Sequence, residues 1–418
     1  MRHILQADWP NSDMPGLKGD SAMPGGRIAP VSGRRGLHVV PFSFTLARMP
    51  RRPPPLPASD PALRAPGRGT LAQPAVRFER QHREWAHDGW DIPEEERSLA
   101  REVAIERPRR VIAWNESPDL GFDRAVNPYR GCEHGCIYCY ARPSHAYLGL
   151  SPGLDFETRL LARPEAPQVL ARELGRKGYR VAPLALGTNT DPWQPIEGQH
   201  RITRALLEVL RDCRHPVTIT TRGALIARDA DILAEMAALD LVSVGISVTT
   251  LDKDLARAME PRAPSPERRL QTIAALHDAG VPVRLMLAPV IPALTDHEME
   301  AIMAEARAAG ARSAWWSLLR LPREVHPLFE DWLARHRPNH AGRVMRQLSG
   351  MRGGRVNDPR FGSRFRGSGP LAELLAQRFR LAHRRLGYES ARPLDCSRFT
   401  PPHVGAKKAA GDAQLSLF

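Results

Sequence analysis

The sequence predicts an α/β fold: a partial (β/α)6 barrel that is open on one side. Short, largely apolar runs alternate with amphipathic stretches along the middle of the chain, which is typical of parallel β/α units. The apolar runs lack a polar face, as expected for strands that are covered on both sides. Gly280 and Gly310 come directly after two of the amphipathic stretches, at positions where helices commonly end.

Six units can be traced in order along the chain. The predicted strands are residues 125–128, 181–187, 217–221, 241–248, 283–288 and 314–319. The predicted helices between and after them are residues 202–213, 229–239, 266–279, 296–309 and 324–335. Active groups of β/α barrels gather at the carboxyl ends of the strands, so we expect a functional site there.

The regions that flank these units have a different composition. We divide the chain into a disordered, basic Pro/Gly/Arg-rich extension at 1–75, a lead-in at 76–120 that packs outside the barrel, a core at 121–340, a basic extension at 341–400 and a flexible tail at 401–418. The basic extension contains one more amphipathic helix, at 371–386. The 418 residues leave room for one barrel-sized domain and these additions.

The formal net charge is +14, and it is concentrated at the two ends of the chain. Residues 1–80 carry 12 Lys and Arg against 5 Asp and Glu, and residues 340–418 carry 15 against 5. Basic ends on a nearly neutral centre are the electrostatic pattern of a protein that binds a polyanion such as DNA. A genome that uses arginine freely is the alternative explanation, because only five of the 60 basic residues are lysine.

The sequence predicts a cytoplasmic protein that does not enter a membrane. No apolar run reaches the roughly 18 residues of a transmembrane helix. The N-terminus lacks an uninterrupted apolar segment with a small-residue cleavage site, so we expect no secretion. Five cysteines, three of them in one loop, suit a reducing compartment.

These three cysteines, Cys132, Cys136 and Cys139, have the spacing C-x3-C-x2-C. Three thiolates on one short loop can hold three corners of a cubane iron–sulfur cluster and leave the fourth iron open. A zinc site would need a fourth ligand, for which His134 lies within the loop. Disulfides fit poorly, because cysteines this close form strained pairs and one would be left over. We interpret the loop as the site of an open 4Fe–4S cluster.

The cysteine loop resembles the signature of the radical S-adenosylmethionine superfamily. The run Asn127-Pro128-Tyr129-Arg130-Gly131 before it and Ala141-Arg142-Pro143 at its end resemble the branch that includes spore photoproduct lyase, and the similarity extends over about residues 77–359. The resemblance implies that the cluster binds S-adenosyl-L-methionine and that one electron cleaves it to a 5′-deoxyadenosyl radical, which takes hydrogen from a substrate. An electron donor such as flavodoxin or ferredoxin is then an expected partner.

Polar side chains follow the predicted strand at 181–187. The candidates there for contact with S-adenosyl-L-methionine are Asn189, Thr190, Asp191 and Glu197. Amides and hydroxyls can bind a ribose, and a carboxylate can pair with an ammonium group. Clusters of this kind also cap helices, and a helix is predicted to begin nearby. We favour the cosubstrate interpretation.

Four further candidates come from other parts of the predicted core. Thr220 and Ser247 lie at the ends of the next two strands, where apolar runs change to hydroxyl side chains. Arg269 offers a guanidinium group for the carboxylate of S-adenosyl-L-methionine, with a surface ion pair as the alternative. In the family that the chain resembles, the side chain before the third cysteine commonly lies near the adenine; this is Tyr138 here, and shielding of the cluster is the other interpretation.

The spare thiols argue against one particular reaction. Spore photoproduct lyase is understood to return a hydrogen atom from a cysteine. The cysteines outside the loop are Cys213 and Cys396, and neither aligns with such a donor. We therefore expect a different lesion or substrate.

The chain ends in Gln414-Leu415-Ser416-Leu417-Phe418, which resembles the pentapeptide by which bacterial repair and replication proteins bind the DNA sliding clamp. The Leu and Phe side chains would fill an apolar groove and the Gln would bond at its rim. An apolar chain end without function is the alternative. We predict a radical S-adenosylmethionine enzyme that acts on damaged DNA in a lyase-like repair reaction. The alternatives are radical modification of RNA or protein, or a non-catalytic DNA-binding protein that contains a cluster.

Overall fold

A computed structural model describes residues 67–70, 72–78 and 101–402, which contain one large and one small sheet. The large sheet has the strand order β10-β9-β8-β7-β6-β3-β2. Its strands are β2 (Ala113–Trp114), β3 (Arg124–Val126), β6 (Leu184–Leu186), β7 (Val217–Thr221), β8 (Val242–Ser247), β9 (Val283–Val290) and β10 (Ser313–Leu318). The strands from β3 to β10 are parallel, and β2 pairs with β3 in the antiparallel direction at one edge.

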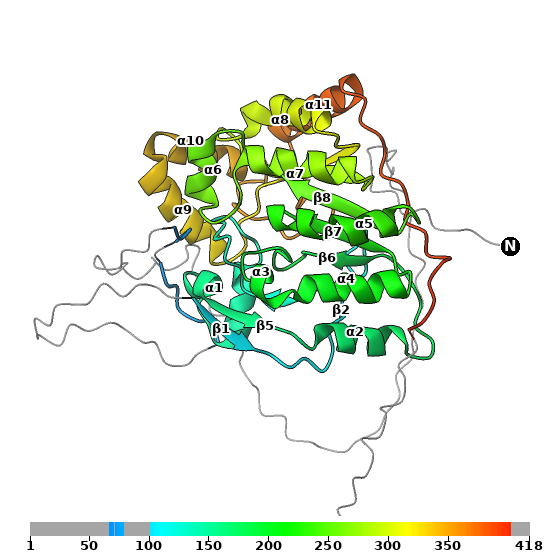
Figure 1. The fold of residues 1–418 in the computed structure, drawn as a ribbon. Helices are drawn as coiled ribbons and strands as arrows, with labels where there is room; N and C mark the ends of the chain where they lie inside the picture. Colours follow the sequence, from blue (N-terminus) through cyan, green and yellow to red (C-terminus); the bar gives the residue numbers. More distant parts are fainter. Residues whose placement is uncertain (1–66, 71, 79–100, 403–418) are drawn as a thin grey trace, which may run out of the picture.

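Helices cover the outer face of this sheet. They are α2 (Ala166–Leu174), α4 (Ile202–Asp212), α5 (Ala230–Ala237), α7 (Pro266–Asp278) and α8 (Met299–Ala308). Figure 1 shows them stacked in chain order over the strands. On α4, Ile202, Leu206 and Leu210 are buried because they recur every four residues and so face the sheet together. Burial of each such side chain contributes roughly 2 kcal/mol to stability.

The predicted α/β fold with a parallel sheet is confirmed. The strand predicted at 217–221 coincides with β7, and the other predicted strands of the large sheet differ from the observed ones only at their ends. The described strands form no closed barrel, because β2 and β10 remain the two edges of the sheet. The open side that we predicted lies between these edges.

The lead-in and the residues around the cysteine loop form the small sheet, with the order β1-β5-β4. Its strands are β1 (Glu102–Ile105), β4 (Tyr129–Arg130) and β5 (Arg159–Ala162). Short helices complete this part of the fold and the loops above the strands: η1 (Arg142–Leu148), α1 (Asp155–Thr158), α3 (Glu197–His200), η2 (Ala224–Asp229), α6 (Lys253–Met259) and η3 (Asp296–Glu298). η3 is the first part of the helix predicted at 296–309, which continues as α8. The sequence did not predict the other elements, which are too short to carry a clear period.

The basic C-terminal extension folds back onto the sheet. Its helices are α10 (Pro338–Gly350) and α11 (Pro370–Arg385), which follow α9 (Val325–His336). α11 is the helix predicted at 371–386, and it packs against α8. The chain then passes the amino ends of the strands, where Glu389 N donates to Arg312 O (2.8 Å) and Thr400 N donates to Cys213 O (2.9 Å). Figure 1 shows this segment in red along the edge of the molecule.

Two predicted regions fall wholly or partly outside the described residues. The tail Gln414–Phe418 lies outside them, as do residues 1–66 of the extension that we expected to be disordered. Residues 67–70 and 72–75 of that extension are described, and they pack against the cysteine loop instead of lying free. No helix in the described ranges is both long enough and apolar enough to cross a bilayer.

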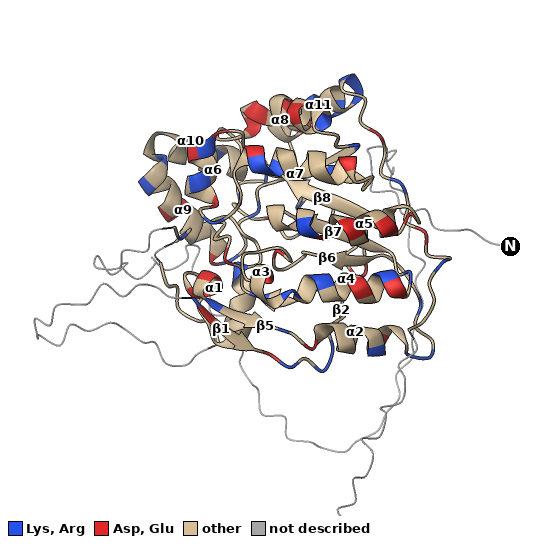
Figure 2. Cartoon of the chain, in the orientation of Figure 1, with Lys and Arg blue, Asp and Glu red and all other residues tan. Residues whose placement is uncertain are grey.

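Charges on the outer helices are mixed in sign. Figure 2 shows Lys and Arg interspersed with Asp and Glu along α4 and α5. The outer helix layer therefore has no single-sign face in this view on which a polyanion would be held.

Candidate functional site

The three cysteines lie just beyond β3, between β4 and η1, at the carboxyl end of the parallel sheet. Cys132 and Cys136 are buried, and Cys139 is partly buried. Backbone hydrogen bonds shape the loop: Cys132 N donates to Phe156 O (2.9 Å) and Cys139 N donates to Cys136 O (3.1 Å). All three thiols are free of disulfides. The loop therefore presents three unpaired thiols within one turn-rich segment.

Two glycines allow this loop to turn where a side chain would not fit. Gly131 and Gly135 have φ angles of +74° and +68°, in the left-handed region that favours glycine. A Cβ atom on Gly131 would lie 2.9 Å from the Phe156 carbonyl oxygen, and one on Gly135 would lie 2.8 Å from a Glu157 carboxylate oxygen. Both turns are thus restricted to glycine by conformation and by space.

A segment before the barrel covers the cysteine loop from outside. We call residues 67–70 and 72–78 the N-terminal strap. Gly69 N donates to Glu157 Oε2 (2.9 Å), and Thr70 and Ala72 are buried. At the other end of the strap, Arg77 pairs with Glu324 (2.6 Å) at the start of α9. The strap is therefore attached at both ends, to Glu157 and to the start of α9.

A buried ion pair supports the loop from below. Arg142 and Glu157 are both fully buried, and Arg142 Nη2 lies 2.5 Å from Glu157 Oε1. Arg142 also donates to Cys136 O (3.0 Å) and Gly153 O (2.9 Å), so its guanidinium group is satisfied by a carboxylate and by main-chain carbonyls. From the sequence, Arg142 was known only as part of the Ala141-Arg142-Pro143 resemblance, which did not predict this role.

Gln194 joins the cysteine loop to the segment after β6. Its Nε2 donates to Gly131 O (3.1 Å), and its Oε1 accepts from Glu133 N (2.9 Å). The side chain is fully buried. Both ends of one amide thus fix the backbone on either side of Cys132. Sequence reasoning missed this residue, although a glutamine inside a predicted site segment was a usable signal.

Arg222, which follows β7, brings positive charge to the cysteines. Its Nη1 lies 3.0 Å from Cys136 Sγ, 2.6 Å from the Tyr138 hydroxyl and 3.0 Å from Glu260 Oε1. Burial raises the pKa of Cys136 to about 12, and the Arg222 charge opposes that effect. Arg222 is therefore placed to stabilise negative charge on this sulfur.

Arg269 makes several contacts within the protein. It is buried and pairs with Glu260, and it also donates to the main-chain oxygens of Pro264 (2.9 Å) and Ser247 (3.2 Å). Burial alone would raise the pKa of Glu260, but Arg269 and Arg222 lower it to about 2. Arg269 is thus occupied within the protein, and its contact with a cosubstrate carboxylate remains a prediction.

A cavity of about 690 Å³ lies against the inner face of the large sheet and extends to the carboxyl ends of its strands. Of the predicted site residues, Tyr138, Cys139, Asn189, Thr220 and Ser247 line it together. They come from the cysteine loop, from the segment after β6, and from β7 and β8. The cavity wall thus joins one candidate cluster ligand to hydroxyl and amide groups from three strands, as expected for the ends of parallel strands.

Arginines dominate the charge of this cavity. The lining includes Arg130, Arg163, Arg222, Arg284, Arg320 and Arg364, and it includes no Asp or Glu among the described residues. Carboxylates lie behind several of these arginines; Glu106, for example, pairs with Arg130 (2.8 Å) and Arg163 (2.9 Å). The interior surface therefore attracts anions, in contrast to the mixed charge of the outer helices.

Three predicted residues of the segment after β6 do not line the cavity. Thr190 donates from Oγ1 to Tyr129 O (3.2 Å). Asp191 accepts from Thr221 Oγ1 (2.6 Å) and Arg222 N (2.9 Å). Burial alone would raise the pKa of Asp191, but nearby His134 and these hydrogen bonds hold it well below its usual range. Their direct contact with a cosubstrate remains a prediction, whereas their observed contacts hold loops in place.

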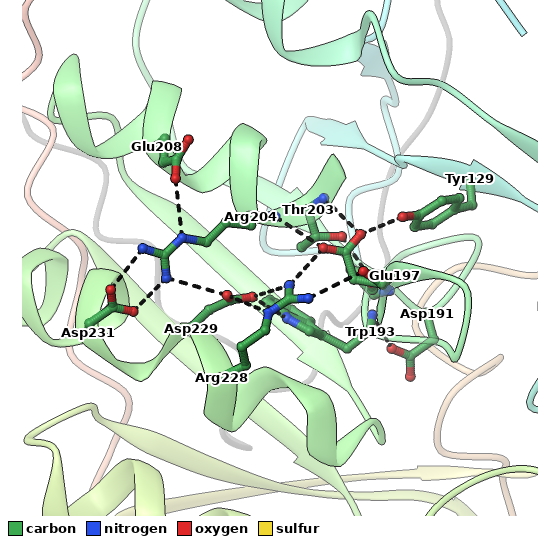
Figure 3. A network of polar contacts seen from close by, with 11 residues as sticks. Tyr129, Asp191, Trp193, Glu197, Thr203, Arg204, Glu208, Arg228, Asp229 and Asp231 are labelled. Carbon is green, nitrogen blue, oxygen red and sulfur yellow. Dashed lines mark hydrogen bonds and ion pairs between the residues drawn. The ribbon is translucent and has the colours of Figure 1, made fainter. Parts of the chain in front are cut away.

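Glu197 lies at the centre of a buried polar network (Figure 3). It accepts from the Tyr129 hydroxyl, from Thr203 N (3.0 Å) and from Arg228 Nη2 (2.9 Å). Arg228 also pairs with Asp229 (2.9 Å), to which the Trp193 indole donates (2.8 Å). The network extends outward from Asp229 through Arg204, which bonds Asp231 and Glu208. It ties the segment after β6 to α4 and η2.

The arrangement of ligand side chains separates a cluster from a single metal ion. Within the described residues, no three His, Cys, Asp or Glu side chains gather closely enough to bind one metal ion. In a cubane, each cysteine binds a different iron, so the three sulfurs need not converge on one point. His134, the possible fourth zinc ligand, has its Nδ1 3.4 Å from Asp191 Oδ2. The donor set and the glycine turns fit a cluster better than they fit zinc.

Comparisons with known proteins identify the family. The profile of the Radical SAM superfamily matches residues 126–306. An uncharacterized protein of Mycobacterium tuberculosis (strain ATCC 25618 / H37Rv) is 39% identical over 236 residues, which cover 55% of this chain and 69% of that protein. The chain belongs to the radical SAM superfamily. Radical SAM enzymes use a 4Fe–4S cluster and S-adenosyl-L-methionine, so this chain is an enzyme with these cofactors.

More distant similarities are also present. An uncharacterized protein of Methanocaldococcus jannaschii is 25% identical over 178 residues, which cover 43% of this radical SAM protein and 64% of that one. A solved structure of spore photoproduct lyase complexed with dinucleoside spore photoproduct is 13% identical, with a TM-score of 0.49, and the match covers 68% of this chain and 80% of that chain.

Proposed function

We propose that this radical SAM enzyme binds its cluster through Cys132, Cys136 and Cys139 and acts on damaged DNA in a lyase-like repair reaction. When bound, the cluster and S-adenosyl-L-methionine together supply a 5′-deoxyadenosyl radical that takes a hydrogen atom from the substrate. The protein contributes the enclosure for this chemistry. Its cavity, its buried loop and its charges decide which substrate is held close enough to react.

The side chains around the cavity have distinct tasks in this proposal. The cosubstrate is bound by hydroxyl and amide groups on the cavity wall that contains Cys139. These groups belong to Tyr138, Asn189, Thr220 and Ser247. The proposed cosubstrate site also includes Thr190, Asp191, Glu197 and Arg269, whose contacts within the protein hold the loops of this wall in place. Arg222 bonds Cys136 and Tyr138, and so links the cluster ligands to the cosubstrate wall.

The observation that supports a nucleic-acid substrate is the charge of the cavity. Six arginines and no carboxylate among the described residues line the space beside Cys139. Glu106, Glu260 and Asp119 pair with four of these arginines from behind the wall. The carboxylates are fewer than the guanidinium groups, so the wall keeps net positive charge that the phosphates of a strand would neutralise. DNA is favoured over RNA by the C-terminal pentapeptide, for which we propose binding to the DNA sliding clamp.

Reductive cleavage of S-adenosyl-L-methionine is the first test. The reconstituted protein with dithionite should form 5′-deoxyadenosine. Cys136→Ala should abolish both the cluster absorbance and this product, whereas the matched control Cys213→Ala should retain both, because Cys213 lies at the end of α4 away from the loop. Intact cluster absorbance without any 5′-deoxyadenosine would overturn the enzymatic proposal.

The DNA substrate needs a separate test. Protein, deuterated S-adenosyl-L-methionine and ultraviolet-damaged DNA are incubated together, and the nucleosides are analysed by mass spectrometry. Label in a DNA product, or depletion of one lesion, supports DNA repair. If label appears only in RNA or only in a peptide offered in parallel, the substrate is RNA or protein and the proposal of DNA is refuted.

Two partners belong to the same proposal. Deletion of Gln414–Phe418 should remove binding to purified sliding clamp while cluster content is unchanged; undiminished binding would refute the clamp contact. Reduced flavodoxin or ferredoxin should replace dithionite in the cleavage assay. Failure of both proteins to support cleavage would refute them as electron donors.

A further inference from the structure

A loop of the basic C-terminal extension spans the open side of the sheet. We call residues 351–369 the bridging loop. Leu318 N, at the end of β10, donates to Phe365 O (2.8 Å). Arg352 is buried and donates to Leu319 O (2.6 Å) and Arg364 O (3.2 Å). The loop is thus fixed to β10, one edge of the sheet, through its main chain.

The bridging loop also reaches the opposite edge. Arg364 Nε donates to Asp119 Oδ2 (2.7 Å), and Gly362 N donates to the same oxygen (3.2 Å). Asp119 lies in the connection between β2 and β3. Because β2 and β10 are the two edges of the open sheet, the loop joins them, and both Arg364 and Phe365 line the cavity between them.

Two guanidinium groups meet at this bridge. Arg320 lies 5.1 Å and Arg364 4.8 Å from the centre of the Phe365 ring. Asp119 neutralises Arg364, whereas Arg320 makes no ion pair within the described part of the chain, and its buried Nε has no hydrogen-bond partner. Burial, with Arg364 nearby, lowers the pKa of Arg320 from its ordinary value. The pair therefore carries uncompensated positive charge on a cavity wall.

An aromatic side chain faces the same cavity from the other edge. Trp114 on β2 lines the cavity and is 62% exposed. The Arg124 guanidinium lies 4.6 Å from its ring centre and covers one side of the indole. A large exposed indole beside an arginine-lined space offers a stacking surface for a planar group.

We propose that the bridging loop, together with Arg320 and Trp114, forms a strand-binding element. Arg320 and Arg364 bind one backbone phosphate, and Trp114 stacks with a neighbouring base. Arg320 can donate to two oxygens of a phosphodiester, whereas Arg364, whose Nε and Nη2 bond Asp119, contributes its remaining Nη1 group and its charge. Stacking needs a base that is not paired, so the element selects a single-stranded or locally opened strand over an intact duplex. This inference rests on the proposed function. It adds that the DNA substrate is bound as a single-stranded or locally opened strand.

Binding of a short DNA strand tests the proposal directly. The full-length reconstituted protein is titrated against a fluorescently labelled single strand and against the same sequence as a blunt duplex, with anisotropy as the readout. The single strand should bind more tightly. Arg320→Gln should weaken single-strand binding about tenfold or more and reduce the slope of log affinity against log salt by about one. Arg320 has no ion pair to lose, so this substitution leaves the bridge itself intact.

Two further variants separate charge from structure. Arg320→Lys keeps the charge and should retain most of the affinity. Arg211→Gln, on the outer face of α4, removes an arginine paired with Asp212 and should bind as the unchanged protein does. Trp114→Ala should weaken binding of the normal strand by about fivefold to a hundredfold, with little effect on a strand that is abasic throughout.

The outcomes distinguish this proposal from the proposed function. Unchanged affinity and salt slope in Arg320→Gln, or preference for the duplex, would overturn the strand-binding element while leaving DNA repair in place. If the unchanged protein forms 5′-deoxyadenosine but binds neither strand nor duplex, both this element and the DNA substrate fail, and only the radical chemistry remains. The visible absorbance of the reconstituted cluster is recorded for Arg320→Gln beside the unchanged protein, so that a loss of binding is not confused with a loss of the folded cluster site.

Discussion

Arg142 and Glu157 form a fully buried ion pair beneath the cysteine loop. Each partner also makes a second kind of contact: Arg142 bonds the Cys136 carbonyl oxygen, and Glu157 accepts from Gly69 of the N-terminal strap. The pair therefore links the loop and the start of η1 to α1, which contains Glu157, and to the strap. A charge pair in this position holds its geometry firmly, because neither partner has water as an alternative.

Removal of one partner of this pair should therefore lower the free energy of unfolding substantially. Arg142→Met leaves the Glu157 carboxylate buried without its cation, and we expect a loss of about 3–5 kcal/mol in the free energy of unfolding. Urea unfolding followed by tryptophan fluorescence measures it. Arg142→Met combined with Glu157→Gln should recover part of the loss. Arg211→Gln, which breaks an exposed pair, should cost at most about 1 kcal/mol. Equal losses at the buried and exposed pairs would contradict the role assigned to Arg142.

The strap should protect the cluster from air. A Cβ atom on Gly69 would lie 1.7 Å from the Gly135 carbonyl oxygen, so Gly69→Ala must displace the strap or the loop. We expect the visible absorbance of the reconstituted cluster to bleach several-fold faster in air. Gly350→Ala is the matched control, because nothing lies within 4 Å of its added Cβ atom. Equal bleaching in the two variants would show that the strap does not shield the loop.

The parts of the fold that the sequence predicted are those with local signals. β7 alternates between buried and partly buried residues, and α4 repeats its apolar residues every four positions. The cysteine spacing is equally local. The small sheet was not predicted, because β4 has only two residues and its pairing with β5 connects distant segments.

Roles that depend on long-range contacts escaped sequence reasoning. Glu197 was predicted to contact the cosubstrate because it follows a strand end, and nothing in the sequence indicated its contact with Tyr129, which precedes it by 68 residues. Arg142 and Arg320 are two among many arginines in the chain, and only burial distinguishes them. A pattern of residue types shows where polar groups gather; it does not show which of them are already satisfied by the protein.

Arg222 should set the reduction potential of the cluster. It lies 3.0 Å from Cys136 Sγ, and positive charge with a hydrogen bond to a ligand sulfur favours the reduced state. Arg222→Gln should therefore shift the midpoint potential to a more negative value, measured by redox titration with electron paramagnetic resonance. Arg222→Lys keeps the charge and should restore most of the potential. If both variants match the unchanged protein, Arg222 does not act on the cluster.

His215 should make the fold sensitive to mild acid. Burial lowers its pKa to about 4, and it is held neutral between the Tyr179 hydroxyl (2.8 Å) and Pro216 O (2.9 Å). Between about pH 6.5, its ordinary value, and pH 4, the unfolded chain binds a proton that the folded chain does not, so stability falls as pH falls. From pH 7 to pH 5 this histidine should remove about 2 kcal/mol of unfolding free energy. Urea unfolding at the two pH values measures this fall in unfolding free energy. His215→Gln should be less stable at pH 7 but should lack the part of the fall that comes from His215. His340→Gln, at an exposed position, should show the same fall as the unchanged protein. An identical pH dependence in His215→Gln and the unchanged protein would show that His215 is not the group responsible.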